Sequence, residues 1–152
     1  MSDEVSIMRE IESLRERLET AAPSPAGLAG TLEVAWEAFD LLLATCRACE
    51  DQSDELFAAF SFASAAAAQG RHLVWGAPSL PLASAGGSRR AVSVVDDLEE
   101  IADALAGLAR VMSGRLSSAA RDVPDPGDRG ACADAAREAG QIYQLLKRDR
   151  RW

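Results

Sequence analysis

Two pairs of carboxylates are spaced so that each pair lies on one side of a helix. Glu16 and Glu19 stand three residues apart in the first expected helix, and Glu37 and Asp40 repeat that spacing in the second. Two such helices packed antiparallel would offer four carboxylates to one ion. Carboxylate oxygens are ligands that Mg²⁺ prefers, and bound Mg²⁺ can activate water for hydrolysis. The first candidate site is therefore a magnesium site.

The pattern of these two acidic pairs resembles that of the all-α NTP pyrophosphohydrolases of the MazG type. The resemblance covers only the two helices that carry the carboxylates. It implies a Mg-dependent enzyme that attacks a nucleotide pyrophosphate. The chain departs from what such an enzyme needs, because Glu16 and Glu19 lie away from the apolar stripe of their helix and lysines that could contact phosphates are absent. We therefore favour a solvated acidic helix face.

The three cysteines and the single histidine form a second candidate site. Cys46 and Cys49 make a C-x-x-C pair, but the pair falls in mid-helix, whereas redox pairs gain reactivity from a helix N-terminus. With His72 and Cys132 the pair would complete a Cys₃His set for Zn²⁺, as in a small metal- or thiol-based sensor. Nothing in the spacing brings His72 or Cys132 to the pair, so we favour thiols buried as small apolar side chains. An odd cysteine count fits reduced thiols in the cytoplasm.

Other catalytic chemistry has little support in the sequence. A single histidine excludes mechanisms that need two imidazoles, and no glycine-flanked serine elbow occurs. Gly86 and Gly87 lack the spacing of a phosphate-binding loop. His72 lies close to Trp75, where an aromatic neighbour favours packing over catalysis. We expect no catalytic residue and no cofactor.

The apolar periodicity is helical along the chain and predicts an all-α protein. In the first helix, predicted over 1–22, apolar residues recur at spacings of four, three and four: Ile7, Ile11, Leu14 and Leu18. Alone, a helix this short is marginal in water, so its apolar stripe must lie against the same subunit or against another copy. We predict that these four residues, together with Trp75, are interaction residues.

The next segment predicts one long helix over about 25–69. Ser24 followed by Pro25 is typical of a helix start, and apolar residues keep heptad spacing from Leu28 to Ala67. A break in the polar stretch near 51–53 is the alternative. We favour continuity because a loop would be expected to reset the heptad phase. Gly70 is the expected stop, followed by a loop over 70–91.

Two further helices are predicted over 92–120 and 128–148. Ser93 is the expected cap of the first, and the Pro- and Gly-containing segment 124–127 predicts a turn before the second. Short links join the helices within each half of the chain, and one long link joins the halves. This pattern favours an antiparallel bundle of four to five helices in a single domain over residues 1–152.

Charge and composition limit the partners. The 152-residue chain has 24 acidic and 16 basic residues, and the formal net charge of -8 argues against nucleic acid or an anionic membrane as partner. Fifteen of the 16 basic residues are Arg, a bias typical of a high-GC bacterial genome. No stretch approaches the ~20 apolar residues of a membrane helix, and the first ten residues lack a secretory signal. We expect a cytoplasmic protein.

Together these features favour a non-enzymatic helical protein–protein interaction or regulatory module over the hydrolase and the sensor. Several helices offer more apolar surface than one four-helix core needs. Their Ala-rich faces allow a second copy, or another protein, to approach closely. We expect a homodimer or an unidentified partner protein.

Overall fold

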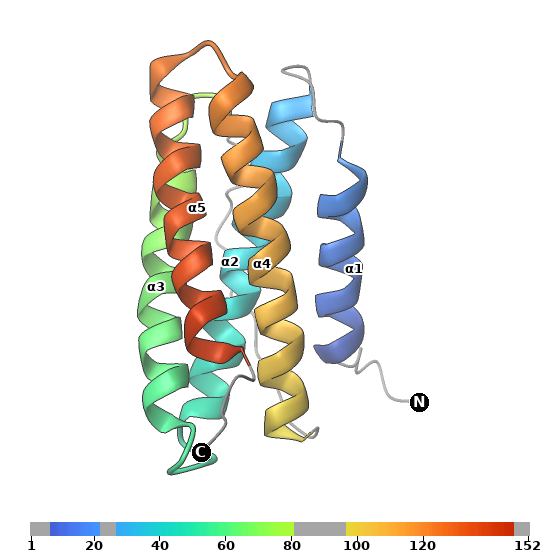
Figure 1. The fold of residues 1–152 in the computed structure, drawn as a ribbon, viewed down its shortest axis with the longest axis vertical. Coiled ribbons are helices and arrows are strands. Elements are labelled where there is room, and N and C mark those ends of the chain that lie inside the picture. Colours follow the sequence, from blue (N-terminus) through green and yellow to red (C-terminus); the bar gives the residue numbers. More distant parts are fainter. Residues whose placement is uncertain (1–6, 22–26, 81–96, 148–152) are drawn as a thin grey trace.

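The protein is described here by a computed structural model, which covers residues 7–21, 27–80 and 97–147. Within these ranges the chain forms five helices and no strand: α1 (Ile7–Thr20), α2 (Leu28–Glu50), α3 (Phe57–Trp75), α4 (Leu98–Asp122) and α5 (Pro126–Leu146) (Figure 1). The predicted all-α fold is confirmed.

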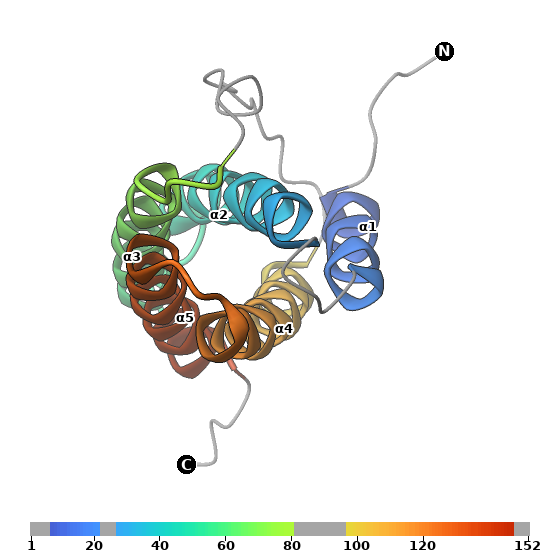
Figure 2. The ribbon, with the colours of Figure 1, turned by 90° about the horizontal axis from the view of Figure 1, so that it is seen from above.

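Four of the helices form an antiparallel bundle. Viewed along the bundle, α2, α3, α5 and α4 follow one another around a ring, and α1 lies outside it against α2 and α4 (Figure 2). Each helix of the ring runs opposite to its two neighbours, whereas α1 runs parallel to α4 (Figure 1). The predicted bundle architecture is therefore confirmed, with α1 as an added fifth helix.

The core is one apolar cluster to which all five helices contribute. Helix α2 is buried on nearly every side, as expected for a helix whose apolar residues are not confined to one stripe. Helices α1 and α4 have a polar face and a buried face. Figure 2 shows α3 between α2 and α5 in the ring, with the side of α3 that faces away from the ring not covered by another described helix.

The segment predicted as one long helix is two helices, α2 and α3, which are joined by residues 51–56. The alternative prediction, a break near 51–53, is therefore confirmed, and the favoured prediction of one continuous helix is wrong. Ser53 Oγ accepts a hydrogen bond from Leu56 N at 3.3 Å, which supports the turn into α3. Leu56 is buried, so the connection returns an apolar residue to the core seven positions after Cys49. The heptad phase is therefore kept although the chain reverses direction.

The predicted stop at Gly70 is also wrong. Helix α3 continues to Trp75, and Gly76 forms its C-cap by donating its N–H to His72 O at 3.2 Å. Gly70 lies inside the helix against Phe39 of α2. A Cβ at residue 70 would lie 2.7 Å from Phe39 Cδ1, so glycine at this position allows α2 and α3 to approach closely. The predicted loop over 70–91 therefore begins as helix.

The boundaries of the other helices differ slightly from those predicted. In α4 the capping residue is Asp97, whose side chain accepts hydrogen bonds from Glu99 N at 2.8 Å and Glu100 N at 3.4 Å. Helix α4 ends at Asp122 and not at residue 120, whereas Ser93 and the predicted starts at Ser24 and Pro25 lie outside the described residues.

The predicted turn before the last helix is partly helical. Helix α5 starts at Pro126 because Asp125 caps it and proline suits a first helical position. The helix ends at Leu146, two residues before the predicted end. At the other end of the chain, α1 occupies Ile7–Thr20 of the predicted 1–22.

None of the five described helices combines the length and the apolar character needed to cross a membrane.

Candidate functional site

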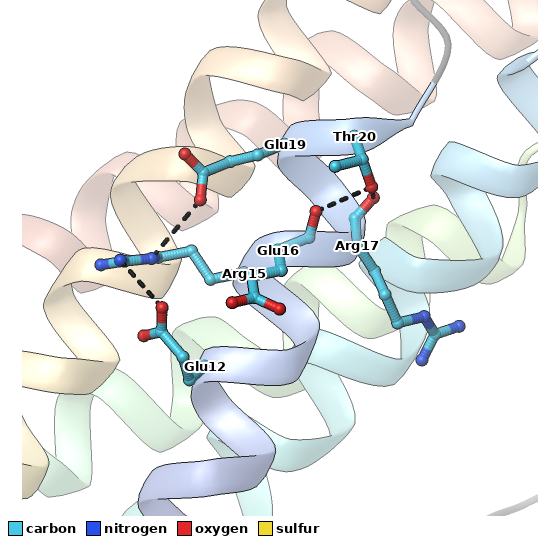
Figure 3. Close-up of polar contacts among 6 residues, drawn as sticks. All are labelled: Glu12, Arg15, Glu16, Arg17, Glu19 and Thr20. Atoms are coloured by element: carbon cyan, nitrogen blue, oxygen red, sulfur yellow. Dashed lines mark hydrogen bonds and ion pairs between the residues drawn. The ribbon is translucent and has the colours of Figure 1, made fainter.

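The predicted magnesium ligands on α1 lie on its exposed surface (Figure 3). Arg15 lies between two acids of the same helix, with Nη2 3.1 Å from Glu12 Oε1 and Nε 3.5 Å from Glu19 Oε1. Glu16 contributes its backbone carbonyl to a 2.9 Å hydrogen bond from Thr20 Oγ1. Surface ion pairs of this kind contribute less than about 1 kcal/mol each.

The two predicted ligands on α2 each pair with an arginine from another helix. Glu37 Oε2 lies 2.8 Å from Arg17 Nη1 and links α2 to α1. Asp40 Oδ1 lies 2.6 Å from Arg71 Nη1 and links α2 to α3. The Asp40 side chain is only 4% exposed, so Arg71 offsets the cost of burying its charge.

The structure does not bring either predicted metal set together. Among the residues that the structure describes, which include all eight predicted ligands, no three His, Cys, Asp or Glu side chains are grouped so that they could hold a metal ion. Glu16, Glu19, Glu37 and Asp40 lie in ion pairs or on the surface of α1. The convergence of four carboxylates that the hydrolase requires is therefore not found.

The cysteines are free thiols in the bundle core. Cys46 and Cys49 lie on α2 and Cys132 lies on α5, all buried, whereas His72 is exposed on α3. Burial raises the pKa of the Cys46 thiol well above its usual range, and the neighbouring Cys49 and Glu50 add to that shift. Burial also raises the pKa of Cys49 to about 11, and burial with the nearby Asp128 raises that of Cys132 to about 11. These thiols are poor nucleophiles at neutral pH.

The four predicted interaction residues of α1 are used inside the subunit. Ile7, Ile11, Leu14 and Leu18 are buried in the core, where α1 packs against α4 and α2. A hydrogen bond from Arg115 of α4 to the backbone carbonyl of Ala21 fixes the end of the helix. Of the two alternatives for this stripe, contact with the same subunit is the one observed, so these residues do not form an external surface.

The remaining predicted interaction residue, Trp75, lies on a surface that is unusual for this protein. Trp75 is 50% exposed, and the other large apolar side chains that the described residues expose are Phe57 at 47% and Phe62 at 65%. All three belong to α3. We use the name α3 outer face for the exposed side of this helix, formed by Phe57, Ala58, Phe62, Ala65, Gln69, His72 and Trp75.

The α3 outer face is nearly without charge. Among the five described helices, α3 alone has no Asp or Glu, and its one arginine is Arg71. The Arg71 guanidinium is engaged by Asp40 and stands 6.0 Å from the ring centroid of Trp36 on α2. Both partners draw this charge toward α2. Exposed aromatic and small side chains therefore dominate the face, with Gln69 and His72 as its polar members.

The end of α3 is anchored to α5. Ser79, four residues after Trp75, donates from its backbone N to Asp128 Oδ1 at 2.9 Å and from its hydroxyl to Asp128 Oδ2 at 2.6 Å. Asp128 is buried, and its backbone N donates to Asp125 Oδ2 at 2.9 Å in the first turn of α5. These hydrogen bonds tie the chain that follows α3 to the first turn of α5. They therefore restrain the backbone next to Trp75.

Helical periodicity within α3 separates the exposed aromatic residues from the buried ones. The buried residues of α3 include Phe60, Ala63, Ala67 and Val74, which repeat with helical spacing and mark the inner side. Phe57 and Phe62 do not belong to that stripe, and both are exposed. A helical projection that starts at Phe57 would have separated them from the buried residues.

The chain was compared with known proteins. No family model matches it, and neither the curated proteins nor the solved structures include a match.

Proposed function

We propose that the protein is a non-enzymatic helical interaction or regulatory module whose docking surface is the α3 outer face. The observation that carries the proposal is the placement of the exposed aromatic residues. Within the described part of the chain, the large apolar side chains left exposed all lie on one helix, and that helix lacks acidic residues. Aromatic side chains are enriched in protein interfaces, whose centres are depleted of charge.

The three aromatic side chains supply enough apolar area for recognition but not for a permanent complex. Each side chain offers about 150–250 Å² in all, so the exposed halves together amount to roughly 300 Å². At about 25 cal/mol per Å² this area contributes roughly 7 kcal/mol to association. Association itself costs about 4–15 kcal/mol, so the aromatic residues alone predict a weak, reversible complex.

The setting of the proposed module follows from charge and thiol state. The free, buried cysteines support a reducing compartment, and we propose the cytoplasm. The net charge of -8 supports a protein as partner over nucleic acid or an anionic membrane. No observation among the described residues favours the hydrolase or the sensor, so neither is proposed.

A photo-crosslinking experiment in the native cell tests this function. A photoreactive amino acid replaces Phe62 on the α3 outer face or, as the matched control, Ala133, which is exposed on α5. We expect discrete protein adducts from position 62, with far fewer from position 133. We also expect Trp75→Glu in the same chain to remove the position 62 adducts. Equal labelling at the two positions would refute the proposal.

A further inference from the structure

The occupant of the α3 outer face can be inferred from its charge and its residue spacing. We propose that the face binds the same face of a second copy of this chain, with the two α3 helices antiparallel and crossing near Ala65. This inference rests on the function proposed above and names the partner.

The distribution of charge makes the α3 outer face the described helix face at which a second copy meets the least repulsion. Two copies each carry a net charge of -8 and repel one another at long range. A twofold interface places the same residues of both copies in contact, so acids on the contacting face would meet acids. Exposed acids lie on the other faces, for example Glu16 on α1, Glu100 on α4 and Asp134 on α5. The α3 outer face has none, so it can meet itself without that penalty. A basic partner would instead be drawn to the acidic helices.

The spacing of the exposed residues gives the face the form of a helix-packing stripe. Ala58, Phe62, Ala65, Gln69 and His72 recur at intervals of four, three, four and three. Helix α3 has 19 residues and is therefore roughly 28 Å long at 1.5 Å per residue. Small side chains at Ala58 and Ala65 allow the axes of two packed helices to lie about 8–10 Å apart.

An antiparallel pair fits this stripe better than a parallel pair does. With the crossing at Ala65, His72 of one copy faces Ala58 of the other, and Phe62 lies beside Gln69 of the other copy, so the two Phe62 side chains do not meet. A parallel pair would set Phe62 against Phe62 and His72 against His72, which leaves gaps beside the alanines. Opposed helix dipoles also favour the antiparallel pair. A single helix stripe is smaller than the roughly 800 Å² per partner of a standard interface, so the dimer should form reversibly.

Single-cysteine crosslinking tests both the partner and the direction of the pair. The native thiols do not interfere, because Cys46, Cys49 and Cys132 are buried. One exposed residue at a time is replaced in the full chain, and the protein is treated with a short bismaleimide. Circular dichroism verifies that each variant keeps its helical content. Ala133→Cys on α5 measures collisional crosslinking.

The antiparallel pair predicts a distinctive pattern. Ala65→Cys should give crosslinked dimer at least tenfold above Ala133→Cys. Ala58→Cys and His72→Cys should each give little dimer alone, and an equimolar mixture of the two should crosslink well. Efficient crosslinking of Ala58→Cys alone and His72→Cys alone would overturn the antiparallel arrangement. No dimer above the Ala133→Cys level at any of these positions would overturn self-association.

The two proposals fail in different ways. If position 62 gives adducts in the cell only with another polypeptide, the module remains and the second copy is excluded. If neither the cellular experiment nor the cysteine variants give products above their controls, both proposals are wrong.

Discussion

Replacing Gly70 by alanine tests the close packing of α2 on α3. Alanine is preferred over glycine in a helix by about 1 kcal/mol, so the substitution would stabilise a helix that had space for it. Here the new Cβ would lie 2.7 Å from Phe39 Cδ1, and two further ring carbons would be closer still. Phe39 is fully buried, so its ring can move only if the surrounding core side chains also shift. Overpacking of this kind costs about 1–3 kcal/mol, and the helix preference of alanine offsets about 1 kcal/mol of it, so we expect a net loss of up to about 2 kcal/mol.

Urea unfolding of the intact protein provides the measurement. The matched control is Gly114→Ala on α4, where the added Cβ meets nothing within 4 Å. That control should gain up to about 1 kcal/mol from helix preference alone. In Phe39→Leu, where the ring is gone, Gly70→Ala should cost less than in the original chain. If Gly70→Ala raises the free energy of unfolding as Gly114→Ala does, the close approach of the two helices is wrong.

Three further substitutions or conditions test the interactions that support the site. Burial raises the pKa of the Cys49 thiol from 9.0 to about 11. The contribution of the protonated thiol to the free energy of unfolding is therefore fully present below about pH 9 and is lost as the pH rises toward 11. Its alkylation at pH 8 should be at least about a hundredfold slower in the folded than in the unfolded protein, as mass spectrometry would record. Arg71→Met removes the guanidinium that pairs with a buried carboxylate of α2 and should cost about 2 kcal/mol on denaturation. The matched Arg137→Met, which removes an exposed pair, should cost less than about 0.5 kcal/mol. Asp128→Ala removes both bonds from Ser79 and should cost about 2 kcal/mol, with faster amide exchange at Ser79.

The inner faces of the helices could be predicted from the sequence, because the apolar residues of a helix recur on the side that is buried. The spacing of Ile7, Ile11, Leu14 and Leu18 predicts an apolar stripe that lies against the same subunit or another copy, and all four residues are in the core of the subunit. Periodicity does not record the direction of the chain. Cys49 and Leu56 are seven residues apart and both buried, so their spacing is the same for one long helix and for two helices joined by a turn. The hairpin therefore could not be distinguished from a straight helix by phase.

Glycine and the interaction surface were harder to predict because both depend on tertiary neighbours. Glycine is a residue type that often ends a helix, so Gly70 predicts a helix end. In the structure Gly70 instead packs against Phe39, which lies on another helix 31 positions earlier in the chain. The spacing of the acidic pairs predicts a metal site, but Glu37 and Asp40 form ion pairs with arginines of α1 and α3. The exposure of Phe62 likewise depends on tertiary packing, because α3 packs against α2 and α5 on one side and leaves its other side exposed.

The mass of the protein in sedimentation equilibrium tests the central proposal most directly. We expect the average mass of the original chain to rise with concentration from that of one chain toward that of two. Phe62→Glu, which places a charge on the α3 outer face, should keep the mass of one chain over the same concentrations, while Ala133→Glu should behave as the original does. A single-chain mass at all concentrations, or a dimer that Phe62→Glu leaves unchanged, would contradict self-association through this face.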